Sequence, residues 1–188
     1  HQAEQRGTGH AVRQALPGLP DDDVALILYG DVPLIRTATL RKLVARARRG
    51  ELALLTAEFA DPAGYGRILR GARGRIEGIV EEKDATPAQR ALCEGNTGLL
   101  ACPAGLLAGW IRRLKANNAQ GEYYLTDIVA LAARDGVPVA GILATDVDEV
   151  FGINDRRQLA VAERILQRRR AGELLDAGVT LADPDRLI

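Results

Sequence analysis

The chain has 188 residues, of which 47% are hydrophobic, and its 25 basic residues are balanced by 25 acidic ones. This length and composition suit a globular protein with a sizeable core. A formal net charge of zero argues against a dedicated nucleic-acid binder, because such proteins gather Lys and Arg on one face. No segment approaches the roughly 18 apolar residues of a membrane-spanning helix, so we expect a cytoplasmic protein with no membrane or nucleic-acid partner.

Hydrophobic periodicity and turn residues predict alternating helices and strands along the whole chain. The alternation predicts an α/β fold with a mostly parallel sheet and helices on both faces. In chain order we expect a helix over 8–16, a strand over 24–29, a helix over 36–51, a strand over 52–59, a turn-rich loop over 61–68, a strand over 75–84, a short helix over 87–92, a strand over 94–102, a helix over 103–115, a loop over 116–123, a helix over 125–136, a strand over 137–145, a loop over 148–155 and a long helix from 155 to about 177.

The residues with special chemistry give no sign of a zinc or nucleophilic site. Cys93 and Cys102 are too few and too far apart for zinc, and we expect reduced cysteines that pack in the interior of a cytoplasmic protein. His1 and His10 lack a partner pattern, so we interpret both as structural or exposed. The basic stretch QRRRAG, residues 167–172, predicts a solvated helix face.

A polar turn follows the first predicted strand. The stretch LILYGDVPLI, residues 26–35, is an apolar run interrupted by Gly30 and closed by Pro33, which predicts a strand buried on both faces. In open α/β sheets the ligand lies beyond the carboxyl ends of the strands, so Asp31 is placed where a ligand is met. Gly30 lets a large group approach the backbone. The alternative is that Asp31 caps a tight turn.

Three further polar segments lie at strand ends or in loops. They are VEEKD at 80–84, EGNTG at 94–98 and FGIND at 151–155. In a doubly wound sheet these segments and YGD at 29–31 can converge on one side, which predicts a ligand site built from segments far apart in sequence.

Several motifs together resemble one family. YGDVPLI, GYGRI, GIVEEKDAT, EGNTGLLA, NNAQGEYYLTDI and GINDRRQLAVAER occur in the order and approximate spacing of the bacterial N-acetylglucosamine-1-phosphate uridyltransferases. The resemblance covers nearly all of the chain, and NAQGEYYLTD is specific to that family. It implies a Rossmann-like nucleotidyltransferase fold, of the nucleotide-diphospho-sugar transferase kind. It also implies that UTP and N-acetylglucosamine 1-phosphate are converted to UDP-N-acetylglucosamine and pyrophosphate, for cell-wall and lipopolysaccharide precursors.

Two parts of the family pattern do not occur in this sequence. Family members begin with a glycine-rich segment of the type LAAGxGTRMxSxxPK, which grips the triphosphate, and they continue into a β-helix domain that forms a homotrimer. We therefore expect residues 1–154 to be a partial uridyltransferase domain and 155–188 to be a helix and the start of a linker. We also expect the 188 residues by themselves to show little uridyl transfer, because a triphosphate needs a cradle of N–H groups and a cation.

The resemblance assigns a metal site to two residues. The aspartate of the family's GD motif, here Asp31, and the asparagine of its GxN motif, here Asn154, would bind Mg2+, with Asp31 as the catalytic residue. Mg2+ prefers oxygen ligands, few of them from the protein and the rest from phosphate and water. The alternative for Asn154 is an N-cap of the last helix, a role that Asp155 is equally able to fill.

The resemblance also assigns the substrate contacts. The uracil would be read by a segment near the start of the chain, and a glutamine amide offers both a donor and an acceptor to a pyrimidine edge. Tyr123 and Tyr124 are also compatible with the core, and Lys83, near the sugar phosphate by analogy, with the surface. The uracil residues would be Gln2, Gln5, Gly7 and Thr8, those for the sugar phosphate Gly66, Glu81, Asn96 and Thr126 with Tyr29 and Gly30 beside them, and those for the acetamido group Glu122 and Tyr124.

Two other functions fit parts of the pattern. A metal-dependent glycosyltransferase of the same fold normally has a second aspartate two residues after the first, where this chain has Pro33. The third interpretation is a fragment that binds a sugar nucleotide without catalysing a reaction. For the uridyltransferase, we expect direct displacement, in which a phosphate oxygen of the sugar phosphate attacks the α-phosphorus of UTP and pyrophosphate leaves, with no Ser or Cys nucleophile.

Overall fold

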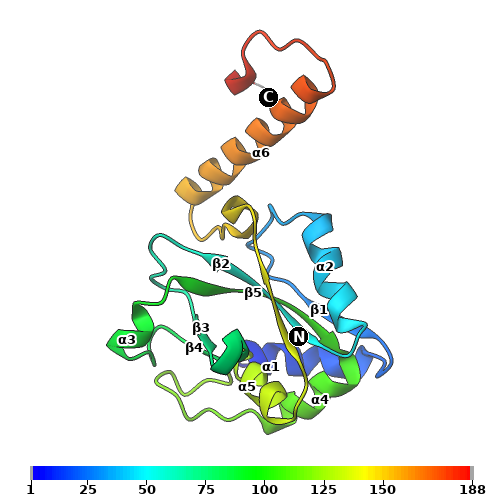
Figure 1. Ribbon diagram of the computed structural model, residues 1–188, viewed down its shortest axis with the longest axis vertical. Coiled ribbons are helices and arrows are strands. Elements are labelled where there is room, and N and C mark those ends of the chain that lie inside the picture. Colours follow the sequence, from blue (N-terminus) through cyan, green and yellow to red (C-terminus); the bar gives the residue numbers. More distant parts are fainter. Residues whose placement is uncertain (1, 187–188) are drawn as a thin grey trace. The chain divides into compact units, whose positions relative to one another are not determined.

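The computed structural model describes residues 2–186, so His1 lies outside the described residues. Helices and strands are interspersed along the chain, although they do not alternate strictly (Figure 1). In chain order the elements are α1 (Thr8–Ala15), η1 (Leu16–Gly18), β1 (Val24–Ile27), α2 (Thr37–Ala47), β2 (Leu52–Glu58), β3 (Arg67–Arg70), η2 (Ala72–Gly74), β4 (Ile76–Val80), α3 (Pro87–Arg90), β5 (Glu94–Pro103), α4 (Ala104–Arg113), α5 (Asp127–Arg134), β6 (Val139–Leu143), η3 (Val147–Val150), α6 (Arg156–Asp176) and η4 (Pro184–Arg186).

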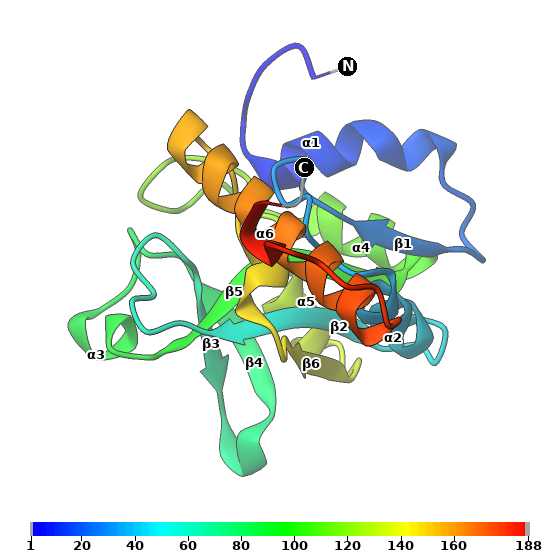
Figure 2. The ribbon, with the colours of Figure 1, turned by 90° about the horizontal axis from the view of Figure 1, so that it is seen from above.

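The α/β class is confirmed, but the prediction of a mostly parallel sheet is wrong. The strand order is β4-β3-β5-β2-β6, and β1 pairs with β5 as well. Among the described pairs, only β2 and β6 run parallel, while β5 is antiparallel to β1, β2 and β3. The segment 61–68, expected to be a loop, contains the start of β3, which forms an antiparallel hairpin with β4 (Figure 2). The connection between β3 and β4 is short, which suits antiparallel strands, whereas parallel strands need a long crossover.

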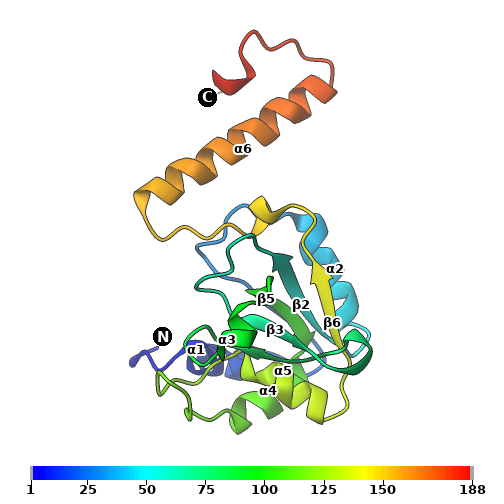
Figure 3. The ribbon, with the colours of Figure 1, turned by 60° about the vertical axis from the view of Figure 1, so that its left-hand side comes forward.

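Helices cover both faces of the sheet, as predicted (Figure 3). Leu52 and Leu54 of β2 face the core that contains Trp110 of α4 and Ile128 of α5. The alternate residues of β2 point to the other face, against which α2 packs with its buried Leu43. A strand that is covered on both faces has apolar residues at nearly every position, which explains why residues 52–57 include no charged side chain.

The strand before Asp31 is less buried than predicted. Only Ala25 of β1 is buried, and Leu28, just after the strand, is 43% exposed. In the described part of the chain β1 pairs with β5 alone, so it is an edge strand and its side chains lack neighbours on one side.

The predictions of two packing cysteines and of a solvated basic helix face at 167–172 are confirmed only in part. Cys102 is buried, and burial raises the pKa of its thiol to about 12, but Cys93 is exposed and is not a packing residue. Arg168 is 68% exposed, as expected of a solvated helix face. Its neighbour Arg169 is only 16% exposed because its guanidinium binds Asp146 at 3.1 Å, so the predicted face is not uniformly solvated.

The chain divides into two compact units. Unit 1 comprises the described residues up to Tyr29 together with Thr37–Thr145, and unit 2 comprises Gly30–Arg36 together with the described residues from Asp146 onward. The functional boundary expected between residues 154 and 155 stays a prediction. None of the helices in residues 2–186 combines the length and the apolar character needed to cross a bilayer.

An ion pair between β3 and β5 makes stability depend on pH. Arg70 donates two hydrogen bonds of 2.7 Å to Glu94, and this pairing lowers the pKa of Glu94. A lowered folded-state pKa stabilises the fold above the unfolded-state pKa, and this stabilisation is lost as pH falls through the folded-state value. Arg70 is 41% exposed, so solvent screening keeps the contribution small.

We expect Glu94→Gln to lower the free energy of unfolding at pH 7 by about 0.5–1 kcal/mol. The difference should shrink as the pH falls through the lowered pKa of Glu94, where the wild-type carboxylate becomes protonated as well. Urea unfolding at pH 7 and pH 3 measures both values, with Glu77→Gln, an exposed change on β4, as the control. An equal loss at both pH values would contradict the electrostatic origin.

Candidate functional site

Unit 1 brings together the residues predicted to hold the sugar phosphate. Thr126 at the start of α5 donates a 2.7 Å hydrogen bond from its hydroxyl to Glu81 Oε1, just after β4. The other carboxylate oxygen of Glu81 lies 3.2 Å from the place that a Cβ on Gly66 would occupy. Ile79 Cγ2 lies 2.9 Å from the same place, so a Cβ at 66 would crowd both side chains, and Glu81 Oε2 keeps acceptor capacity for a ligand.

The same cluster includes Asn96 and Tyr29. The Asn96 N–H donates a 2.7 Å hydrogen bond to the Gly66 carbonyl, and the Asn96 side-chain oxygen accepts from the Gly98 N–H at 3.2 Å. Gly98 has φ of +82°, and the ring of Tyr29 occupies the place that a side chain at 98 would fill. A chain of contacts thus runs from the Tyr29 ring through Gly98 and Asn96 to Gly66, and the Asn96 amide NH2 makes no hydrogen bond among the described residues.

Hydrogen bonds connect the segment predicted to bind uracil to the segment predicted to bind the acetamido group. The Gly9 N–H donates to the Tyr123 carbonyl at 2.8 Å, the Tyr123 N–H to the Arg6 carbonyl at 2.9 Å, and the Leu125 N–H to the Thr8 hydroxyl at 3.0 Å. Gln2 folds back so that its amide nitrogen lies 3.0 Å from His10 Nδ1. Gln5 is exposed and makes no side-chain hydrogen bond in the described chain.

Gly7 joins these two segments for a steric reason. It has φ of +98°, and a Cβ there would lie 2.7 Å from the Tyr123 carbonyl oxygen. We expect Gly7→Ala to lower the free energy of unfolding by about 1–3 kcal/mol, because both the backbone strain and the clash oppose it. Gly18→Ala, where no atom lies within 4 Å of the new Cβ, is the matched control and should change stability little. Thermal unfolding of both variants measures the difference, and equal values would contradict this role.

Carboxylates surround the predicted acetamido side. Tyr124 is 8% exposed, and burial, followed by the nearby charges of Asp84, Glu81 and Glu122, raises its pKa to about 12. Burial, with Glu81 and Asp84, also raises the pKa of Asp127. A concentration of negative charge suits hydroxyl and amide N–H donors and disfavours a phosphate. This region can therefore hold the neutral part of a sugar better than its phosphate.

Asn118 is a residue that the sequence reasoning missed. Its side-chain oxygen accepts from the Glu122 N–H at 3.1 Å, and its amide donates to the Glu122 carbonyl at 2.5 Å. Ala119, the next residue, donates its N–H to Asp84 at 2.8 Å. Asn118 thus shapes the loop that presents Glu122; an asparagine in a glycine-containing loop is the available sequence signal.

Unit 2 brings Asp31 and Asn154 to neighbouring segments. The Ile153 N–H donates a 2.8 Å hydrogen bond to the Asp31 carbonyl. Asp155 caps α6, accepting from the Gln158 N–H at 2.8 Å, so the alternative role for Asn154 belongs to its neighbour. The side chains of Asp31 and Asn154 are exposed and make no hydrogen bond in the described residues, which leaves their oxygen atoms for a cation.

Among residues 2–186 no three or more His, Cys, Asp or Glu side chains are grouped as a metal site. Two protein ligands are enough for Mg2+, which keeps several waters or phosphate oxygens.

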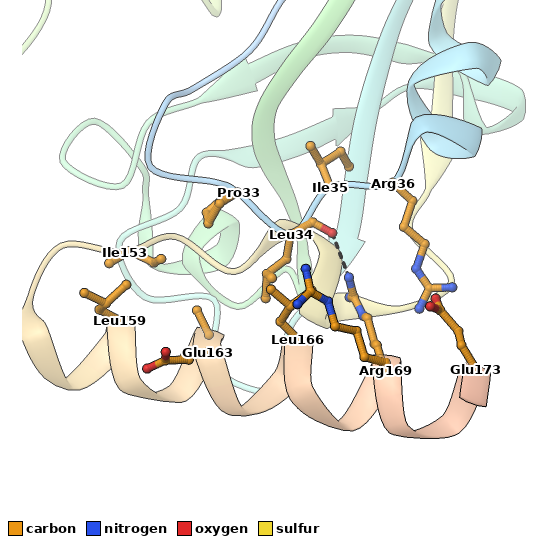
Figure 4. Close-up of a pocket in the computed structure, with 12 residues that line it drawn as sticks. Pro33, Leu34, Ile35, Arg36, Ile153, Leu159, Glu163, Leu166, Arg169 and Glu173 are labelled. Atoms are coloured by element: carbon orange, nitrogen blue, oxygen red, sulfur yellow. Dashed lines mark hydrogen bonds between the residues drawn. The ribbon is translucent and has the colours of Figure 1, made fainter. Parts of the chain in front are cut away.

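A separate cavity of about 540 Å³ lies within unit 2, between α6 and the segment 33–36 (Figure 4). Its walls are apolar at Leu34, Leu159 and Leu166, and Arg169 crosses it to donate a 2.8 Å hydrogen bond to the Leu34 carbonyl. None of the predicted site residues lines this cavity.

The family of the chain follows from comparison with known sequences. Residues 1–94, half of the chain, match the family described as "MobA-like NTP transferase domain". The chain belongs to this NTP transferase family. The strands and loops that carry Glu81 and Gly66 lie within the matched part.

Three curated relatives of this NTP transferase chain carry the same name. The chain is 58% identical over 185 residues to "Bifunctional protein GlmU" of Alkalilimnicola ehrlichii and to that of Azotobacter vinelandii, covering 98% of this chain and 40% of each relative. It is 58% identical over 186 residues to the protein of the same name from Pseudomonas aeruginosa, covering 99% of this chain and 41% of the relative. The chain thus spans about two fifths of the length of these relatives.

The predicted residues of this NTP transferase chain fall into two groups. In unit 1 hydrogen bonds and close contacts connect the residues predicted for the uracil, sugar and acetamido groups, apart from the exposed Gln5. In unit 2 Asp31 and Asn154 lie on adjoining segments, and Gly30 has no atom within 4 Å of the place of a Cβ. Lys83 is exposed, in agreement with the surface alternative.

Proposed function

We propose that this chain is part of a uridyltransferase that forms UDP-N-acetylglucosamine and pyrophosphate from UTP and N-acetylglucosamine 1-phosphate, with Mg2+ as the metal. The observation that carries the proposal is the Glu81–Thr126 hydrogen bond of 2.7 Å, packed against Gly66 and next to Asn96. These groups offer acceptors and an amide to sugar hydroxyls, each of which needs a partner when it is buried.

In the proposed reaction unit 1 orients the sugar. Glu81 accepts a hydrogen bond from a sugar hydroxyl, and Glu122 and Tyr124 lie beside the acetamido group. A phosphate oxygen of the sugar phosphate then forms a bond to the α-phosphorus of UTP, while the bond from that phosphorus to the pyrophosphate oxygen breaks. Orientation and charge neutralisation supply most of the rate increase, as in other phosphoryl-transfer reactions.

Asp31 and Asn154 would hold the Mg2+ ion of this proposal. Their exposed oxygen atoms, with no competing hydrogen bond in the described residues, fit a hard cation. A bound Mg2+ offsets the charge on phosphate oxygens. Cytoplasmic location, the role in cell-wall and lipopolysaccharide precursors, the division at residue 154, and a homotrimer formed by the family's β-helix domain are proposals that rest on the resemblance.

Uridine selectivity would come from the segment around Gln2 and Thr8. This segment is held to residues 123–125 by three hydrogen bonds between 2.8 and 3.0 Å, which fixes its backbone for base recognition. Preorganised polar groups discriminate strongly, because a wrong base leaves them unpaired.

The test is an assay of the product of the complete gene. With UTP, N-acetylglucosamine 1-phosphate and Mg2+ we expect pyrophosphate release, and little release with glucose 1-phosphate or with CTP. Equal use of glucose 1-phosphate would contradict the sugar assignment. Binding of UDP-N-acetylglucosamine without pyrophosphate release would favour a non-catalytic protein, and release of UDP from that compound a glycosyltransferase.

A further inference from the structure

Arg67 on β3 is a charged residue inside the protein. Its side chain is 2% exposed, and its guanidinium contacts its own segment at Tyr65 and two other segments, at Glu82 and Arg90. It contacts Glu82 Oε2 at 2.7 Å, donates to the Arg90 carbonyl at 3.3 and 3.4 Å, and donates to the Tyr65 carbonyl. A buried guanidinium is costly unless it is paired and hydrogen-bonded, and here one carboxylate and two carbonyls meet that need.

Each partner of Arg67 is adjacent in sequence to a residue, or to a strand, that contributes to the predicted sugar pocket. Tyr65 precedes Gly66, and Glu82 follows Glu81. Arg90 ends α3, from which the chain enters β5, the strand that carries Asn96. Arg67 thus connects the three segments that supply the carbonyl, the carboxylate and the amide of the pocket.

The backbone around Arg67 shows what these connections hold in place. Arg67 lies opposite Val80 on β4 and opposite Gly95 on β5. The Gly66 carbonyl accepts from the Asn96 N–H at 2.7 Å, and Glu81 Oε2 lies 3.2 Å from the place that a Cβ on Gly66 would occupy. A small movement of Tyr65 or Glu82 would therefore change the distance between Gly66, Glu81 and Asn96.

We propose that Arg67, through Glu82, is a positioning residue that sets the spacing of Gly66, Glu81 and Asn96 for an N-acetylated sugar phosphate. The identity of this ligand rests on the proposed function. Arginine suits the position because its planar fork binds a carboxylate and two carbonyls at once, whereas lysine has a single ammonium.

The test compares ligand binding by the product of the complete gene and by its variants in calorimetry. We expect Arg67→Lys to weaken binding of N-acetylglucosamine 1-phosphate about tenfold or more, because small misplacements in a preorganised site are costly. UMP, read by the segment around Gln2, should bind within about twofold of the wild-type value, since Arg67 does not contact that segment. Glu82→Gln keeps the bonds of Arg67 to both carbonyls and should give a smaller loss.

A second measurement is independent of any ligand. Hydrogen exchange of the Asn96 amide should accelerate in Arg67→Lys, because the Gly66–Asn96 bond is no longer held. Arg113→Lys is the matched control: Arg113 pairs with Asp135 at 2.6 Å between α4 and α5, and its replacement should change neither binding nor exchange at Asn96. If circular dichroism shows that Arg67→Lys does not fold, the same two measurements on Glu82→Gln test the positioning role.

The outcomes separate this proposal from the proposed function. Equal weakening of UMP and sugar phosphate, or unchanged binding and exchange, would overturn the positioning role. Failure of the wild-type chain to bind sugar phosphate would count against the proposed function, and faster exchange at Asn96 in Arg67→Lys alone would then still support the positioning of Gly66 and Asn96.

Discussion

Replacing Asp31 by alanine in the product of the complete gene is expected to lower the rate of pyrophosphate release about 100-fold or more, because a metal at transferring phosphates contributes several kcal/mol. Asp31 is exposed, its side chain makes no hydrogen bond in the described residues, and its backbone carbonyl is fixed by the Ile153 N–H. Removal of the carboxylate should therefore disturb the metal and leave the fold intact. Steady-state release at saturating UTP and sugar phosphate measures the effect.

Asp22→Ala provides the control, because Asp22 is an exposed aspartate before β1 with no assigned role. Asn154→Ala should raise the Mg2+ concentration needed for half-maximal rate and lower the maximal rate less than Asp31→Ala, because a neutral amide contributes less than a carboxylate. Near-normal turnover of Asp31→Ala would remove the metal assignment, and unchanged Mg2+ dependence of Asn154→Ala would remove Asn154 from it.

Much of the fold was predictable because burial on a helix or a strand leaves a periodic signal. The helix predicted over 8–16 is observed at Thr8–Ala15, and the one predicted over 36–51 at Thr37–Ala47, whose buried Thr39, Leu43 and Ala47 recur every four residues. Strand direction leaves no such signal, so the antiparallel course of β5 was not predicted. The hairpin of β3 was missed because the glycines and the proline at 62–66 dominate the local pattern.

The candidate site was predictable where residue chemistry and the family motifs agree. Glu81 and Thr126 are 45 positions apart, and the family resemblance assigns both to the sugar phosphate, in agreement with their hydrogen bond. The burial of Arg67 is not predictable from the sequence, because arginine is normally exposed and its ion pair with Glu82 forms only in the folded chain. Such pairing depends on the arrangement of three segments, which composition and periodicity do not encode.

Glu81→Ala is expected to raise the KM for N-acetylglucosamine 1-phosphate about 30-fold, because hydrogen bonds to charged groups contribute roughly 1.5–3 kcal/mol. The KM for UTP should change little, since the loss concerns the sugar side. Steady-state kinetics with each substrate varied in turn measures both values.

Two controls separate the contact with the sugar from the effect on Thr126. Glu77→Ala changes an exposed glutamate on β4, the strand that ends just before Glu81, and should leave both KM values unchanged. Thr126 is 7% exposed, so Glu81→Ala leaves its hydroxyl buried without its 2.7 Å partner, whereas Glu81→Gln keeps an acceptor for it. If Glu81→Gln restores the KM fully, the support of Thr126 is what matters and the charge of Glu81 is not needed. If Glu81→Gln stays about tenfold weaker, the carboxylate itself binds a sugar hydroxyl, because charged acceptors form the stronger hydrogen bonds.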